Sequence, residues 1–406
     1  MVSYPSDWEE TKLSDIGDTY SGLTGKTKLD FESGNGKFIT FLNVLNNVKI
    51  DISILGKVHI GYNEKQNAVK VGDLFFNTSS ETPEEVGMCA ALLDNPGVCY
   101  LNSFCFGYRL KCDDVSLLFM SYYFNSPVGR EFMRKHAQGS TRYNLSKQNF
   151  LAQSIPLPPL REQHAIADTL STFDTHIKNL SELIEKKKAI RDGVLDDLMT
   201  GRTRLKGFCG EWKVKKLGDI VDIIRGASPR PIEKFITSNS NGINWIKISD
   251  VTKNKKYIIH TEEKITAIGA SRSIFVKAGD LILSNSMSFG RPYILTISGC
   301  IHDGWLKLFN FDKFVDKVFL CYSLSSQNTY KQYVTFAAGS GVQNLNKNVV
   351  KNVIISLPPL AEQQAIADTL TALDNEISNL EAEHDKIIQV RDGAMNDLLT
   401  GKVRLI

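Results

Sequence analysis

Leu157-Pro158-Pro159-Leu160, followed by Glu162-Gln163, recurs later in the chain as Leu357-Pro358-Pro359-Leu360, followed by Glu362-Gln363. The match continues, because residues 165–170 and 365–370 both read Ala-Ile-Ala-Asp-Thr-Leu, and residues 191–193 and 391–393 both read Arg-Asp-Gly. Both copies end in Leu-x-Thr-Gly-(Arg/Lys)-x-Arg-Leu, and about half of their positions are identical without a gap. The repeat indicates that a unit of about 200 residues has been duplicated.

The segments before the two blocks are also related, but more faintly. Asp7-Trp8 parallels Glu211-Trp212, Gly72-Asp73-Leu74 parallels Gly279-Asp280-Leu281, and Gly139-Ser140 parallels Gly339-Ser340. Similarity therefore concentrates in residues 156–205 and 356–406, whereas residues 1–155 and 206–355 diverge. A duplicated enzyme domain is the plain alternative, but two enzyme copies would be expected to share polar catalytic residues rather than an amphipathic helix.

The two repeated blocks have the periodicity of long helices. Proline at 158–159 and 358–359 is compatible with extended chain that enters a helix, and Gly201 and Gly401 are typical of a helix end. Apolar residues alternate steps of four and three, which is the a/d stripe of a coiled coil. The first stripe is Ile166, Leu170, Phe173, Ile177, Leu180 and Ile184, resuming at Val194 and Leu198, and the second is Ile366, Leu370, Leu373, Ile377, Leu380, Ile387 and Leu398.

The length of these helices predicts how they are used. About 40 residues at roughly 1.5 Å per residue give a helix of about 60 Å, too long for one globular part to cover. Its apolar stripe needs a partner, and the nearest partner is the other copy. Antiparallel pairing would hold the two globular parts apart with pseudo-twofold symmetry, and one turn of B-DNA spans about 34 Å, so such a pair could space two DNA readers. A coiled coil that only mediates dimerisation is the alternative.

We therefore expect an α+β fold in which two globular domains are separated by two long antiparallel coiled-coil helices. Each domain should contain mostly short strands and Gly-marked loops, with a helix or two such as residues 117–124 and 318–324. The expected divisions are a globular domain over residues 1–155, a helix over 156–205, a second globular domain over 206–355 and a second helix over 356–406.

The composition is that of an ordinary soluble globular protein. The 406 residues exceed what one hydrophobic core usually serves, and a net charge of +3 is too small to identify a DNA-binding protein by charge alone. Seven irregularly spaced cysteines without a Cys-x-x-Cys pair favour reduced thiols over disulfides or a zinc ribbon. Residues 1–7 lack the pattern of a signal peptide and no stretch approaches 18 apolar residues, so we expect a cytoplasmic protein without a membrane span.

Three stretches imitate enzyme sites without completing them. Residues 22–27 resemble a phosphate-binding loop, but Tyr20 stands where Gly-x4-Gly-Lys-Thr requires glycine. Asp250 with residues 262–264, Glu-Glu-Lys, resembles a metal-dependent nuclease cluster that the first half of the chain lacks. Cys300 and residues 302–303, His-Asp, offer no oriented nucleophile and base. Because an Asn-Pro-Pro-aromatic methyltransferase motif is also missing from the sequence, we expect neither a catalytic centre nor a metal site.

The Leu-Pro-Pro-Leu-x-Glu-Gln start, the heptad helix and the Leu-x-Thr-Gly-(Arg/Lys) end, present twice behind divergent domains, resemble the specificity subunit of type I restriction-modification systems. The resemblance covers the whole chain. It implies that residues 1–155 and 206–355 are target-recognition domains that each read half of a split site in double-stranded DNA. It also implies that residues 156–205 and 356–406 fix the spacer and dock DNA methyltransferase (modification) subunits.

The same resemblance implies that partner subunits supply the chemistry. In that family the modification subunits bind S-adenosylmethionine and methylate adenine, and a separate restriction motor-nuclease subunit cleaves DNA with ATP and Mg²⁺, so no cofactor is expected on this chain. Two other functions remain open: a coiled-coil scaffold that binds only proteins, and the DNA-reading part of a restriction enzyme whose catalytic part is missing. Salt-dependent, sequence-selective DNA binding would distinguish a specificity subunit from the scaffold. A methyltransferase partner in the same operon would distinguish it from the DNA-reading part of a larger restriction enzyme.

The candidate DNA contacts are polar segments punctuated by glycine, because base edges are read by Arg, Lys, Asn, Gln, Ser or Thr side chains. Such loops are more often ordinary turns, and Arg142 and Arg291 are the stronger candidates. The candidates of the first domain are Asn77, Ser79, Ser80, Ser140, Thr141, Arg142, Tyr143, Asn144 and Lys147. Those of the second are Asn285, Ser286, Ser288, Arg291, Ser340, Gln343, Asn344, Asn346 and Lys347. Phosphate contact suits Lys26, Lys28, Arg225 and Arg230.

Overall fold

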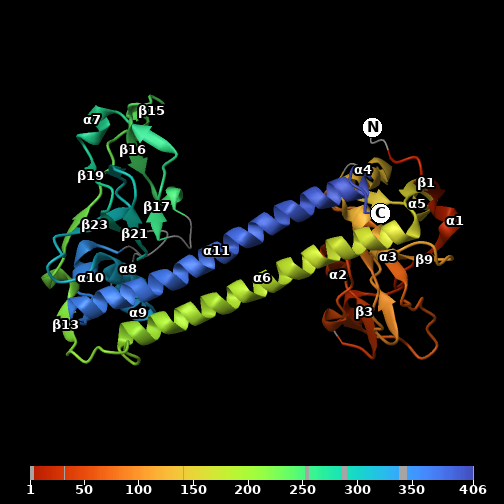
Figure 1. The fold of residues 1–406 in the computed structure, drawn as a ribbon, viewed down its shortest axis with the longest axis horizontal. Helices are drawn as coiled ribbons and strands as arrows, with labels where there is room; N and C mark the ends of the chain where they lie inside the picture. Colours follow the sequence, from red (N-terminus) through yellow and green to blue (C-terminus); the bar gives the residue numbers. More distant parts are fainter. Residues whose placement is uncertain are drawn as a thin grey trace. The chain divides into compact units, whose positions relative to one another are not determined.

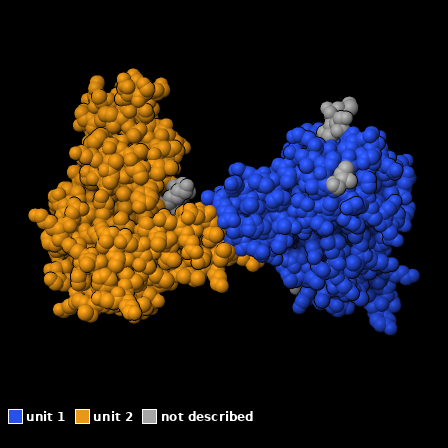
Figure 2. All heavy atoms as spheres, in the orientation of Figure 1, with its two compact units in different colours: residues 1–181, 382–406 blue, residues 182–381 orange. Residues whose placement is uncertain are grey.

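The computed structural model describes residues 4–31, 33–139, 141–251, 256–285, 290–337 and 345–405. The chain divides into two compact units, which Figure 2 shows in different colours. Unit 1 comprises residues 1–181 and 382–406, and unit 2 comprises residues 182–381. Each unit therefore contains one globular part and portions of both long helices.

Unit 1 is built on short strands. They are β1 (Glu9–Lys12), β2 (Gly17–Ser21), β3 (Gly36–Ile39), β4 (Gly56–Val58), β5 (Asp73–Asn77), β6 (Ser79–Ser80), β7 (Cys89–Ala91), β8 (Cys99–Leu101), β9 (Cys105–Leu110), β10 (Ala137–Gln138), β11 (Tyr143–Leu145) and β12 (Ser154–Leu157). Its central sheet is antiparallel in the order β2-β9-β5-β7. Smaller sheets have the orders β4-β3-β8 and β10-β11-β6, and β1 pairs with β12.

Unit 2 repeats this plan with larger sheets. Its strands are β13 (Lys213–Lys216), β14 (Asp222–Arg225), β15 (Ile236–Thr237), β16 (Ile243–Ile246), β17 (Tyr257–Ile258), β18 (Glu263–Ile265), β19 (Ile274–Val276), β20 (Leu281–Ser284), β21 (Pro292–Leu295), β22 (Gly299–Ile301), β23 (Trp305–Phe309) and β24 (Ile354–Leu357). Their orders are β14-β23-β20-β21-β17 and β15-β18-β16-β22-β19, and β13 pairs with β24 as β1 does with β12.

Helices pack on these sheets and connect them. Those of the first half are α1 (Leu13–Ile16), α2 (Phe41–Asn46), α3 (Leu117–Asn125), α4 (Pro127–His136), α5 (Lys147–Leu151) and α6 (Leu160–Thr200), with 3-10 turns η1 (Lys28–Phe31) and η2 (Ile52–Ile54). Those of the second half are α7 (Ala267–Ala270), α8 (Lys317–Ser325), α9 (Gln327–Ala337), α10 (Lys347–Lys351) and α11 (Leu360–Leu399), with η3 (Leu217–Asp219), η4 (Ile232–Lys234) and η5 (Ile248–Asp250). The predicted helices near residues 117–124 and 318–324 are confirmed.

The central strands bury both of their faces because successive side chains point to opposite sides of a sheet. In β5, Leu74 and Phe76 join the core that also contains Phe119 of α3, whereas Phe75 joins a second core with Ile39 and Leu101. Unit 2 divides in the same way, since Leu281 and Leu283 of β20 join one core and Ile282 joins another. The expected α+β class is confirmed.

The long helices begin and end where the sequence predicted. Both follow the Pro-Pro pairs at once, and both end before Gly201 or Gly401, whose φ values of +69° and +68° suit glycine. The start of each helix and the end of the other enter the same globular core. In unit 1 these are Leu170 of α6 and Leu398 of α11, both buried.

Within each unit, α6 and α11 lie side by side and run antiparallel (Figure 1). In unit 1, Asp174 lies 3.7 Å from Arg391, and Ser181 is 3.0 Å from a ring nitrogen of His384. In unit 2, Arg191 lies 3.3 Å from Asp374. Since 174 pairs with 391 and 191 with 374, the same contact occurs twice with the roles of the two helices exchanged. The predicted antiparallel pairing is confirmed within each unit.

The glutamate of each Leu-Pro-Pro-Leu-x-Glu-Gln motif makes equivalent contacts in the two units. Glu162 is buried and accepts from Arg404 Nε and Nη2 at 2.6 and 2.7 Å and from Trp8 Nε1 at 3.3 Å. Glu362 accepts equivalent bonds from Arg204 and Trp212. The arginine of each Thr-Gly-(Arg/Lys)-x-Arg end thus anchors the start of the other long helix in the same unit.

Candidate functional site

Four segments of unit 1 meet at one end of its central sheet, and we call them the loop rim of unit 1: residues 21–23, 77–80, 102–104 and 143–147. They meet there because β2 and β5 end where the antiparallel strand β9 begins. The Gly22 N–H donates to the Cys105 carbonyl at 3.2 Å, and the Thr78 N–H donates to the Phe104 carbonyl at 2.8 Å. The Leu145 N–H donates to the Thr78 carbonyl at 2.8 Å, which adds the fourth segment.

Unit 2 has an equivalent loop rim: residues 225–227, 284–285, 302–304 and 345–347. The Gly226 N–H donates to the Trp305 carbonyl at 2.8 Å. The Asn285 N–H donates to the Gly304 carbonyl, and the Leu345 N–H donates to the Asn285 carbonyl, both at 2.9 Å. The two loop rims therefore share one backbone frame, although the sequence similarity between the globular parts is faint.

The loop rim of unit 1 brings together candidates that are about 65 residues apart in the sequence. Ser79 pairs with Asn144 and Ser80 with Tyr143 on neighbouring strands β6 and β11. The side chain of Lys147 donates to the Ser21 hydroxyl at 2.6 Å. Thr141 and Arg142, just before β11, are exposed. This edge therefore presents hydroxyl, amide and cationic groups from two segments that the sequence indicated separately.

The loop rim of unit 2 is organised around Asp303. Its backbone carbonyl accepts from Arg225 Nε at 2.8 Å and from the Asn285 amide at 3.0 Å. Oδ1 accepts from the Ser228 hydroxyl at 2.7 Å, and Oδ2 lies 3.6 Å from Arg230 Nη2. Arg225, Arg230 and Asn285, predicted from different segments, thus converge on one turn.

Asp303 is ionised more readily than an ordinary aspartate. Partial burial acts to raise the pKa of Asp303, but the Ser228 hydrogen bond and the nearby His302 and Arg225 outweigh it and hold the pKa below its usual value. His302 Nδ1 accepts from the Gly304 N–H at 2.9 Å, and His302 Nε2 lies 2.9 Å from Asp303 Oδ1. The turn therefore holds a charged carboxylate in a defined orientation.

The polar groups of two candidates, Asn77 and Lys26, are bound inside unit 1. Asn77 is fully buried, and its amide bonds to the backbone of Glu85 and Met88 at 2.8 and 2.6 Å. The Lys26 side chain is only 5% exposed and pairs with Glu64 at 2.5 Å. Both side chains stabilise their own loops because their polar groups are already bound inside unit 1.

The other candidates are distributed as follows. Ser80 is buried and donates to Glu85, Asn285 is buried and donates to Asp303, and the Asn346 side chain caps α10. Lys28, Arg291 and Lys347 are exposed. Ser140, Ser286, Ser288, Ser340, Gln343 and Asn344 lie outside the described residues.

Sequence reasoning missed the turns at residues 102–104 and 302–304. The signal is present in the sequence, since residues 302–304 read His-Asp-Gly between two strands, but this pattern also resembles part of an enzyme site. The corresponding turn of unit 1 carries Phe104, whose side chain is 57% exposed.

The enzyme-like stretches form no catalytic arrangement in the described structure. Asp250 accepts from the Lys247 backbone N–H and Glu263 pairs with Lys247. Cys300 is buried against the Ala270 carbonyl. Among the described residues, no cluster of His, Cys, Asp and Glu could hold a metal ion. Within the same residues, no helix is both long and apolar enough to cross a membrane.

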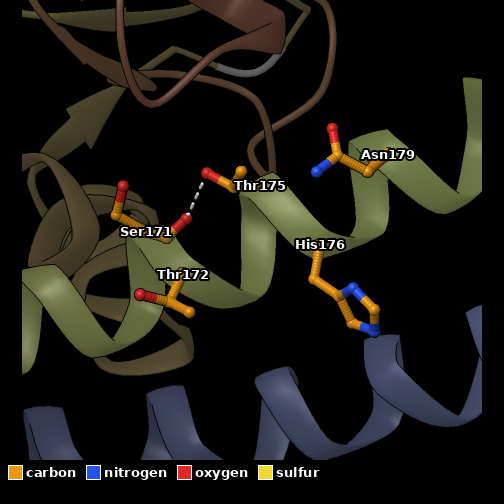
Figure 3. Close-up of a pocket in the computed structure, with 5 residues that line it drawn as sticks. All are labelled: Ser171, Thr172, Thr175, His176 and Asn179. Carbon is orange, nitrogen blue, oxygen red and sulfur yellow. Dashed lines mark hydrogen bonds between the residues drawn. The ribbon is translucent and has the colours of Figure 1, made fainter.

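A shallow hollow on α6 in unit 1 is lined by Ser171, Thr172, Thr175, His176 and Asn179 (Figure 3). The Thr175 hydroxyl donates to the Ser171 carbonyl at 2.8 Å, so it closes a turn of its own helix. His176 points toward α11, where Glu383 lies 3.8 Å away. No described contact joins His176 to a serine or threonine hydroxyl of the hollow, so the loop rims remain the candidate site.

Comparisons with known proteins identify this architecture. The Type I restriction modification DNA specificity domain matches the chain twice, over residues 5–188 and 210–389. The putative type I restriction enzyme MjaX specificity subunit of Methanocaldococcus jannaschii is 28% identical over 429 residues, covering 99% of this chain and 95% of that protein. The MjaVIII specificity subunit of the same organism is 30% identical over 310 residues, or 70% of each protein.

Solved structures show the same fold. The S subunit of a type I restriction-modification system from M. genitalium is 16% identical with a TM-score of 0.59, covering 98% of this chain and 97% of its own. The HsdS subunit from Thermoanaerobacter tengcongensis is 17% identical with a TM-score of 0.51, covering 99% and 98%. Two divergent globular parts, each followed by a repeated long helix, define the class of specificity subunits. The chain belongs to the type I restriction-modification DNA specificity family, as its resemblance predicted, and is a recognition component rather than an enzyme.

Proposed function

We propose that this chain gives a type I restriction-modification complex its DNA target, with residues 1–155 and 206–355 as two target-recognition domains. Each domain would read one half of a split site in double-stranded DNA through its loop rim. The observation that carries this proposal is the shared backbone frame of the two rims with different side chains, Ser103 and Phe104 in one and Asp303 and Gly304 in the other. Two half-sites of different sequence require such a frame, because side chains at base edges specify sequence.

The individual contacts follow from exposure. Arg142 and Asn144 in unit 1 and Arg291 in unit 2 are exposed and carry groups that bond to base edges. Arg225, which the sequence suggested for phosphate contact, is also exposed and could bond to a base edge instead. Lys28, Arg230 and Lys347 are exposed cations suited to phosphates. The candidates outside the described residues remain predictions from sequence.

Residues 156–205 and 356–406 would act as the spacer and as the docking surface for partner subunits. A helix of about 60 Å is long enough to separate two readers by more than one turn of DNA, which spans about 34 Å. The partners would be DNA methyltransferase subunits with S-adenosylmethionine and a restriction motor-nuclease subunit with ATP and Mg²⁺, in the cytoplasm.

The test is to co-express the chain with its neighbouring methyltransferase and to map adenine methylation across the genome by single-molecule sequencing. A split motif with a fixed unspecified spacer is expected. The absence of any motif from a demonstrably assembled complex would contradict the proposal and favour a scaffold that binds only proteins.

A further inference from the structure

One acidic side chain, Asp303, lies among the arginines of the unit 2 loop rim, and among the described residues the partners of its Oδ2 are two arginines at ion-pair distance. Asp303 Oδ1 is engaged by Ser228 and His302 at 2.7 and 2.9 Å. Oδ2 lies 3.6 Å from Arg230 Nη2 and 3.9 Å from Arg225 Nη2. Both distances exceed a normal hydrogen bond, so these groups attract one another without saturating their hydrogen-bonding capacity.

The cluster is held in place before any ligand arrives. Arg225 is anchored through Nε to the Asp303 carbonyl at 2.8 Å, which restricts its guanidinium, and its side chain is still 57% exposed. Arg230 has no equivalent backbone anchor among the described contacts and is 80% exposed. Arg225 and Asp303 therefore form a pre-organised donor and acceptor, whereas Arg230 is the more adaptable cation.

A carboxylate at this position disfavours a surface that only binds phosphate. Asp303 repels the negative backbone and offsets part of the attraction of the arginines. The major-groove edges of bases suit both charges, because arginine donates to guanine O6 and N7 and a carboxylate accepts from the cytosine N4 amino group. The mixed cluster thus matches base edges better than it matches the DNA backbone.

The spacing matches one base pair. Guanine O6 and cytosine N4 are joined by a hydrogen bond of about 2.9 Å, so groups that reach both from the groove must lie about 3–4 Å apart. Arg225 Nη2 and Asp303 Oδ2 are 3.9 Å apart. We infer that Arg225 and Asp303 read one G·C pair in the major groove, with Arg225 donating to guanine and Asp303 accepting from cytosine, while Arg230 contacts a phosphate.

The inference rests on the proposed function and concerns only one half of the target. The corresponding positions in the loop rim of unit 1 are Ser21 and Ser103, because Ser21 pairs with Phe106 as Arg225 pairs with Leu306. Neither serine is charged. The G·C pair should therefore belong to the half-site read by unit 2.

The test compares methylation motifs of assembled complexes that contain the unchanged chain, Arg225→Gln, Asp303→Asn or Arg230→Gln. Arg225→Gln and Asp303→Asn should each reduce discrimination at the same G·C position of the unit 2 half-site by about tenfold to a hundredfold, with the other half unchanged. Arg230→Gln should lower DNA affinity without changing the motif. Asp312→Asn, an exposed residue of unit 2 outside the rim, is the matched charge control and should change neither.

Several outcomes would overturn the inference. An unchanged motif with uniformly weaker binding would mean that Arg225 contacts phosphate, and relaxed specificity in Arg230→Gln would move the reading role to that residue. If Asp303→Asn does not assemble with the methyltransferase, Arg225→Gln alone decides between these outcomes. If the unchanged chain gives a split motif and no variant alters it, only this inference is contradicted. If the unchanged chain gives no split motif, the proposed function itself is contradicted.

Discussion

Phe104 and Gly304 occupy the same place in the two loop rims, since each carbonyl accepts the N–H of the segment that follows β5 or β20. Phe104 is the large apolar group at the unit 1 rim and suits contact with a thymine methyl group. Phe104→Ala should weaken binding to the complete target about tenfold, because the aromatic contact contributes roughly 1–2 kcal/mol. Fluorescence anisotropy with the assembled complex measures the change. Tyr62→Ala, at another exposed aromatic of unit 1, should have little effect, and equal losses would contradict the prediction.

Side-chain chemistry was predictable from sequence at the single-residue level, but side-chain burial was not. The sequence predicts Ser79 and Asn144 as polar loop residues, and their strands are neighbours. Asn77 belongs to the same predicted polar segment as Ser79, and Lys26 is a predicted phosphate contact, yet the polar groups of both are bound within unit 1. Whether such a side chain is exposed or bound depends on its partner in the fold. Lys26 is bound by Glu64, which is distant in sequence, and Asn77 by the turn around Glu85, and the residues next to Lys26 or Asn77 in the sequence indicate neither contact.

The ends of the long helices are stabilised by the cores of the globular parts. Leu170 of α6 is fully buried in the unit 1 core, whereas Val390 of α11 is 45% exposed. Leu170→Ala should therefore lower the free energy of unfolding of unit 1 by about 2–5 kcal/mol. Val390→Ala should change it by less than about 0.5 kcal/mol. Chemical denaturation followed by circular dichroism measures both, and similar losses would show that the helix end does not depend on this core.

The long helices were predictable as elements, whereas the pairing of the short strands was not. Proline, heptad and glycine signals lie within each helix or at its ends, so α6 and α11 could be located closely. Strands β6, β10 and β11 contain only two or three residues, and β6 pairs with β11, which lies about 65 positions further along the chain. Local periodicity carries no information about such a partner, which is why the loop rims emerged only from the structure.

At the scale of the whole molecule, the two duplicated halves share one set of contacts and differ in the side chains of their loop rims. The two halves share the buried Glu162 and Glu362 contacts and the two-helix contacts, and they share the backbone bonds of the loop rims. They differ in the side chains that these rims present, such as Ser103 and Asp303. Helix assembly and target choice can therefore change independently.

Exchange of one globular part tests this independence directly. Because β24 runs from Ile354 to Leu357 and pairs with β13, the exchanged segment should cover residues 206–357, slightly beyond the boundary expected from sequence. Replacement by the matching segment of another specificity subunit should change one half of the methylated motif and leave the other half and the methyltransferase assembly intact. Methylation mapping of the chimera against the parent measures this. A change in both halves would show that the two readers are coupled, and the model of independent target-recognition domains would have to be abandoned.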